Sequence, residues 1–98
     1  MSKELKRQLQ IIDENLEKFR KDYYIKKIGI FGSVARGVEK RKSDIDILVE
    51  FGEPIGIFKF IELENNLTKL LKRKVDLVSK DALKPILKSA ILKEVIYV

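Results

Sequence analysis

Asp44 and Asp46 are the residues of this sequence whose type and spacing best suit chemistry. One isoleucine separates them, at the start of an apolar run that reaches Phe51. Because successive side chains of a strand point to opposite faces, we expect both carboxylates on one face and apolar residues on the other. A rise of about 3.3 Å per residue places the carboxylates about 7 Å apart along the backbone. Such charges repel each other unless a cation neutralises them, and Mg²⁺ suits oxygen ligands of this kind.

Asp76 is a candidate third carboxylate for the same site. In the run 74–79, Val75 and Leu77 alternate with it, so Asp76 is expected on the face opposite to theirs. If this run forms a strand beside the strand of Asp46, the three carboxylates can converge. Such a set is typical of two-metal phosphoryl transfer, with metals roughly 3.5–4 Å apart. Solvent-facing aspartates that bind no metal are the alternative, which the residues alone leave open.

Gly32 and Ser33 follow a short β-branched and aromatic run, 25–31, that is typical of a strand. A glycine at this point lets the backbone approach a ligand closely. Free backbone N–H groups, the serine hydroxyl and the start of a helical turn together make a phosphate-binding cradle. A plain turn with no ligand fits the same two residues.

Composition excludes several classes of enzyme. The chain has 98 residues, which fits one domain, 1–98, and it contains no cysteine and no histidine. Thiolate nucleophiles, imidazole bases and zinc–cysteine sites are therefore excluded. The net charge of +6 favours a polyanion or an acidic protein as partner, although solvating lysines explain it equally. No apolar run is long enough to span a membrane and no signal-peptide pattern opens the chain, so we expect a cytoplasmic protein.

The hydrophobic pattern predicts helices that alternate with strands. The N-terminal segment, 1–22, reads as an amphipathic helix from Ser2 to about Lys21, with Ser2 as N-cap and Lys, Glu, Gln and Arg opposite the apolar stripe. The apolar stripe of this helix consists of Leu5, Leu9, Ile12, Leu16, Phe19 and Tyr23. A second helix is expected from Ile57 to about Arg73, and its apolar stripe consists of Phe60, Leu63, Leu67, Leu70 and Leu71. Ile57, Phe58 and Ile61 widen the second stripe, which suits either a turn or a docked partner.

The remaining segments complete the expected fold. Strands are predicted at 25–31, 44–51 and 74–79, a solvated basic loop at Lys40–Lys42, and a helix from about Asp81 to near Glu94. The apolar end, 95–98, is a candidate strand. This order predicts an α+β (α/β) domain with a small mixed β-sheet flanked by helices. The third strand follows a crossover helix and can lie parallel to the second.

The motif Gly32-Ser33, ten residues, then Asp44-x-Asp46 resembles the signature of the DNA polymerase β-like nucleotidyltransferase superfamily. The longer wording, Phe-Gly-Ser-Val-Ala-Arg-Gly followed by Ser43-Asp-Ile-Asp, is similar to its minimal nucleotidyltransferase (MNT) branch. The Val-Asp-Leu-Val strand and the end from Leu83 to Glu94 also resemble that branch. The resemblance therefore covers nearly the whole chain from Ile25 onward.

The resemblance implies a nucleotidyltransferase (polymerase β-like) fold and a role for each motif residue. Gly32 and Ser33 would hold the triphosphate of a nucleotide, and Asp44 and Asp46 would ligate Mg²⁺, with two ions expected. Asp76 would complete the metal site and help activate the incoming hydroxyl. Arg36 would neutralise phosphate charge, although a solvent-exposed arginine is nearly as good an interpretation.

The MNT branch also implies a partner. Its members resemble antitoxins paired with HEPN-domain ribonuclease toxins, which implies transfer of AMP from ATP to a tyrosine hydroxyl of the toxin (AMPylation). Direct nucleic-acid binding is not required. One alternative is a non-catalytic antitoxin that acts by binding alone. Another is a small-molecule nucleotidyltransferase, although the related enzymes carry an extra helical domain. A basic nucleic-acid-binding domain is a third, but its stacking platform of aromatic residues is missing.

Overall fold

The computed structural model describes residues 1–38 and 44–98. The predicted basic loop Lys40–Lys42, and Ser43 of the motif, lie outside the described residues. The elements, in chain order, are α1 (Lys3–Tyr23), β1 (Ile25–Phe31), α2 (Gly32–Arg36), β2 (Ile45–Phe51), α3 (Ile57–Leu71), β3 (Val75–Ser79), the 3₁₀ turn η1 (Lys80–Ala82), α4 (Pro85–Glu94) and β4 (Ile96–Tyr97).

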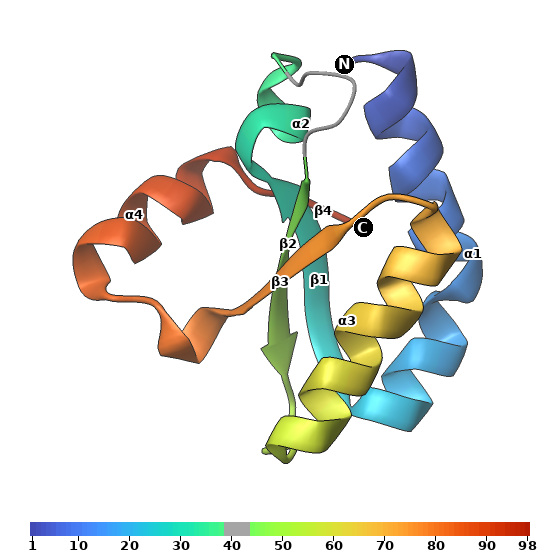
Figure 1. The fold of residues 1–98 in the computed structure, drawn as a ribbon. Helices are drawn as coiled ribbons and strands as arrows, with labels where there is room; N and C mark the ends of the chain where they lie inside the picture. The colour runs from blue at the N-terminus through green and yellow to red at the C-terminus, as the bar shows by residue number, and fades with distance from the viewer. Residues whose placement is uncertain (39–43) are drawn as a thin grey trace.

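The strands of the described chain form one mixed sheet in the order β3-β2-β1-β4. β2 is antiparallel to β1 and parallel to β3, and β4 pairs antiparallel with β1. α1 and α3 cover one face of this sheet, and α4 lies on the other side (Figure 1). The predicted α+β class, the mixed sheet and the parallel third strand are thus confirmed. No helix in the described ranges is long and apolar enough to cross a membrane.

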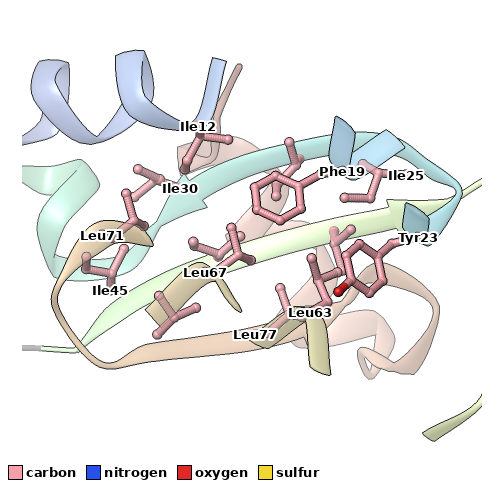
Figure 2. Close-up of a cluster of buried hydrophobic side chains, with 14 of the residues drawn as sticks. Ile12, Phe19, Tyr23, Ile25, Ile30, Ile45, Leu63, Leu67, Leu71 and Leu77 are labelled. Carbon is pink, nitrogen blue, oxygen red and sulfur yellow. The ribbon is translucent and has the colours of Figure 1, made fainter. Parts of the chain in front are cut away.

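The hydrophobic core lies between the sheet and the pair α1 and α3, where the labelled side chains of both layers meet (Figure 2). From α3, Leu63, Leu67 and Leu71 are fully buried, as their helical spacing predicts. β1 contributes Ile25 and Ile28, which are separated by an odd number of steps. A register shift between Ile25 and Lys27 in the β1–β2 pairing explains this, because one extra residue returns the alternation to the same face.

Gln8 corrects the prediction that the glutamines of α1 lie on its polar face. It is completely buried, because position 8 lies three residues after Leu5 and four before Ile12, which are both in the core. Its Nε2 donates to Glu4 Oε1 at 2.5 Å. Its Oε1 is buried and has no hydrogen-bond partner among the described residues. Helical spacing alone therefore placed this side chain better than its polarity did.

Element ends also differ from the prediction. The helix expected from about Asp81 is interrupted, and α4 begins only at Pro85. Lys84 is extended, with ψ of 145°, because a residue before proline is disfavoured in the helical region. α3 ends at Leu71 rather than Arg73, because Lys72 adopts a left-handed conformation with φ of 57°. β2 and β3 each begin one residue later than predicted, at Ile45 and Val75.

β3 is an edge strand, and side chains of α3 occupy backbone donors along it. The Val75 N–H donates to Thr68 Oγ1 at 3.1 Å, and the Leu77 N–H donates to Glu64 Oε2 at 2.9 Å. Unpaired N–H groups on a sheet edge are otherwise open to pairing with another chain. These two bonds flank Asp76 and fix the strand that carries it.

Thr68→Val is expected to lower the free energy of unfolding by about 1–3 kcal/mol, because the partly buried Val75 N–H would lose its acceptor. Thr68→Ser keeps a hydroxyl and is the matched control, expected to retain most of the stability. Urea denaturation followed by circular dichroism measures both. Equal losses in the two variants would contradict a hydrogen-bonding role for Thr68.

Candidate active site

β2 carries Asp46 on the face opposite to the core, and Asp44 directly precedes the strand. Ile45, Ile47 and Val49 are fully buried in the core beneath α1 and α3. Asp46 alternates with them and is therefore on the opposite face, where it is half-buried. Asp44 directly precedes the strand and is exposed. Lys74 Nζ lies 3.9 Å from Asp44 Oδ2, but both side chains are exposed, so this pair adds little stability.

β3 brings the third carboxylate beside the second. In the parallel pairing of β2 and β3, Asp76 is the direct partner of Asp46, so both side chains stand on the same face. Neighbouring strands lie about 4.7–4.9 Å apart. Asp76 is exposed at the edge of the sheet. The prediction that this strand neighbours β2 is therefore confirmed, and Asp46 has Asp76 beside it across the sheet and Asp44 two residues before it along the chain.

Gly32 lies against Asp46 from the other side. β1 pairs Phe31 with Asp46, and the next residue, Gly32, turns away with φ of 77°. A Cβ at this position would overlap the Asp46 carboxylate, so the site needs glycine for its backbone angle and for space. Ser33 follows and is half-buried. Gly37, with φ of 73°, is the C-cap that ends the short helix α2.

Glu94, the last residue of α4, also reaches this turn. Its Oε1 accepts a hydrogen bond of 3.0 Å from the Gly32 N–H, and its Oε2 lies 2.9 Å from Arg36 Nη1. The sequence predicted free N–H groups at Gly32, whereas the Gly32 N–H is already occupied. Glu94 is 62 positions from Gly32 and 58 from Arg36, so no short-range pattern in the sequence links them. Only the apolar 95–98 segment, expected as a strand, indicated that Glu94 is held near the sheet.

The burial of Asp46 and the charges around it raise its pKa. Burial is the main cause, followed by the negative charges of Asp76 and Asp44. Arg36 acts in the opposite direction, and Glu94 adds a smaller contribution that raises the pKa further. The site therefore places negative charges together on one face of the sheet. An approaching cation would be stabilised there, because it would relieve this repulsion.

The residues fit a magnesium ion that shares its ligands with a substrate. Within residues 1–38 and 44–98, no group of three or more acidic residues is close enough to hold a metal ion by itself. Mg²⁺ commonly binds through one or two carboxylates, with substrate phosphates and waters as the other ligands. Asp46 and Asp76, as direct neighbours, meet that requirement, and Gly32 lacks the side chain that would displace the Asp46 carboxylate.

An open cavity of about 820 Å³ lies away from Asp44, Asp46 and Asp76. It is lined at the far ends of β2 and β3 by apolar side chains that include Phe51, Phe60 and Leu77. Ile57, Phe58 and Ile61 on α3 are 65%, 85% and 44% exposed. Their position outside the core agrees with the widened apolar face predicted from the sequence. Docking of a partner on this face stays a prediction.

Comparison with known proteins places the chain beside enzymes that transfer nucleotides. Residues 10–98 match the family model described as a nucleotidyltransferase domain. A protein of Thermococcus cleftensis named protein adenylyltransferase MntA is 44% identical over 88 residues, covering 90% of this chain and 89% of that protein.

Solved structures show the same architecture. A chain in a crystal structure of a toxin–antitoxin with AMP-PNP has a TM-score of 0.74 and 26% identity, with 87% of this chain and 69% of that chain covered. A chain from the tri-AMPylated Shewanella oneidensis HEPN toxin in complex with its MNT antitoxin has a TM-score of 0.68 and 22% identity, covering 92% and 70%. At that identity the second likeness concerns the fold alone.

Asp46→Asn is expected to stabilise the metal-free protein. Because the folded-state pKa of Asp46 is raised, the folded protein binds this proton more tightly than the unfolded chain, and ionisation opposes folding. The gain should be complete at neutral pH, shrink as the pH falls through the raised pKa, and vanish below the ordinary aspartate range. Each 1 kcal/mol gained raises the Tm of a domain this size by about 4–8 °C.

Thermal unfolding between pH 3.5 and 7.5, without divalent ions, measures this gain. Asp13→Asn on the exposed side of α1 is the control, since it changes the net charge equally at a site outside the carboxylate group. A lower Tm for Asp46→Asn than for the unchanged protein at neutral pH would contradict the repulsion.

Proposed function

This chain belongs to the nucleotidyltransferase domain family, and from that premise we propose that it transfers AMP from ATP to a tyrosine hydroxyl of a HEPN-domain ribonuclease toxin, acting as the antitoxin of the pair. The observation that carries the proposal is the pairing of Asp46 with Asp76 directly beside Gly32 and Ser33. Phosphate-binding groups and carboxylates thus share one end of the sheet. Such proximity is the main requirement for nucleotidyl transfer, which depends on positioning and charge stabilisation.

Each residue of the site has a specific role in the proposed reaction. Ser33 and Arg36 bind the phosphates of ATP, and Gly32 lets them approach Asp46. The acceptor hydroxyl oxygen attacks the α-phosphorus, a new P–O bond forms, and the bond to the β-phosphate breaks as pyrophosphate leaves. Asp76, the exposed carboxylate, accepts the hydroxyl proton. The sequence has no histidine to serve as base, so a carboxylate in this role is consistent with the composition.

Magnesium is the expected cofactor, and Asp44, Asp46 and Asp76 are the residues that would hold it. When bound, Mg²⁺ supplies positive charge that offsets both the phosphates and the carboxylates. The raised pKa of Asp46 agrees with a site whose negative charge exceeds the positive charge that the described residues supply. We expect two ions, because three carboxylates are available, and titration of the protein with Mg²⁺ measures the number bound.

The proposed partner rests on the relatives. The Thermococcus protein is named a protein adenylyltransferase, and the structural neighbours are described as toxin–antitoxin complexes. A protein acceptor also suits the geometry, because Asp76 lies on an edge strand and is exposed, where a large molecule can approach it. The apolar side chains of Ile57, Phe58 and Ile61 are available for further contact.

We expect the protein, incubated with ATP, Mg²⁺ and a co-encoded HEPN protein, to add one or more AMP units to that partner. Asp76→Asn should slow the transfer by about 10²–10⁴-fold, because general acid–base groups contribute effects of that size. The double variant Asp44→Asn/Asp46→Asn should abolish it. Intact-mass spectrometry of both proteins, followed over time, measures each rate.

Glu53→Gln, in the exposed turn after β2, is the control and should leave the transfer rate unchanged. The Asp44→Asn/Asp46→Asn variant could still protect cells from the toxin, with a stable complex and no adduct. That result would contradict the enzymatic role and indicate an antitoxin that acts by binding alone. Adducts on a small molecule but never on the HEPN protein would favour the small-molecule transferase.

A further inference from the structure

Glu94 joins two segments that are far apart in the sequence. Its carboxylate contacts both ends of α2, through the Gly32 N–H at 3.0 Å and Arg36 Nη1 at 2.9 Å. The Glu94 side chain is 28% exposed, and Gly32 is buried. Hydrogen bonds to a charged group are stronger than neutral ones, and one carboxylate here makes two of them.

The end of α4 is fastened to the strand that leads into Gly32. β4 follows Glu94 after one residue and pairs with Gly29 and Ile30 of β1, and the Val98 N–H donates to Ile28 O at 2.9 Å. A Cβ on Gly29 would lie only 2.7 Å from Ile96 O, so the absence of a side chain there permits the pairing. Glu94 is thus held against α2 by backbone structure on both sides.

We propose that Glu94 is a positioning residue for the nucleotide, which fixes the Gly32 turn and orients the Arg36 guanidinium toward the phosphates. The proposal rests on the function proposed above. Arginine has five N–H donors in a rigid fork, so the bond to Glu94 leaves others for phosphate. Arg36 is 53% exposed, and without Glu94 it would have to be ordered when the nucleotide binds, which weakens binding.

Glu94 could also weaken nucleotide binding, and the direction in which the Kd changes on its substitution distinguishes the two effects. A carboxylate beside a polyphosphate repels it, so a glutamate that merely competed with the nucleotide would tighten binding when neutralised. A positioning glutamate would weaken binding when neutralised. Glu94→Gln separates the two, because its amide oxygen can still accept from Gly32 while the charge that holds Arg36 is lost.

The experiment measures the Kd of a non-hydrolysable ATP analogue with Mg²⁺ by calorimetry, on the full chain. For Glu94→Gln we expect binding about three- to tenfold weaker, and weaker still for Glu94→Ala. Arg36→Ala should weaken binding too, and adding Glu94→Gln to it should have little further effect, because the two residues act as a unit. Thermal unfolding shows whether each variant is folded. If Glu94→Ala does not fold, the Kd of Glu94→Gln alone decides the test.

Glu50→Gln is the matched control. Like Glu94, Glu50 is a partly buried carboxylate with cationic partners, here Lys26 at 4.0 Å and Lys80 at 3.6 Å, but it lies on the far part of β2. It should alter stability and leave the Kd unchanged. An unchanged or tighter Kd for Glu94→Gln overturns the positioning role, as does full additivity with Arg36→Ala. Failure of the unchanged protein to bind the analogue would instead overturn the proposed function itself.

Discussion

The placement of β2 between two other strands is the constraint on which the site depends. β2 pairs with β1 and β3 at once, and its inner face carries Ile45, Ile47 and Val49, which are fully buried. A slip of one residue would exchange the buried isoleucines for the carboxylates, which would cost far more than it could gain. Burial of the core therefore fixes the register, and the register fixes which carboxylates stand side by side.

The same arrangement explains why carboxylates of like charge gather at the site. Asp46 lies near Asp44 and Asp76 and against the Gly32 turn, and its pKa is raised by burial first and by the two neighbouring carboxylates second. Arg36 offsets part of the repulsion from these carboxylates and is itself paired with Glu94. Stability of the metal-free fold and readiness to accept a cation are therefore opposed here. Binding sites commonly store such local strain, and the surrounding core supplies the stability that maintains it.

Periodicity predicted most of the fold and the shared face of Asp46 and Asp76, because both depend on local alternation. β1 was predicted with its observed bounds, and Asp76 was placed on the correct face by its neighbours Val75 and Leu77. Gln8 was misplaced because polarity was weighed above helical spacing. The role of Glu94 could not be predicted, because its contacts with Gly32 and Arg36 arise only when β4 pairs with β1. Such contacts leave no short-range signal in a sequence.

The difference in exposure between Asp46 and Asp76 gives the site a direction. Asp46 is half-buried between two strands and beside the Gly32 turn, whereas Asp76 lies at the open edge of the sheet. α3 occupies the outer N–H groups of β3 on either side of Asp76, so an incoming chain cannot extend the sheet there. In the proposed reaction, an acceptor would therefore reach Asp76 by its side chain and not by strand pairing. Selectivity in that reaction would then depend on the reach of one acceptor side chain toward an exposed carboxylate, and not on the backbone conformation of the acceptor.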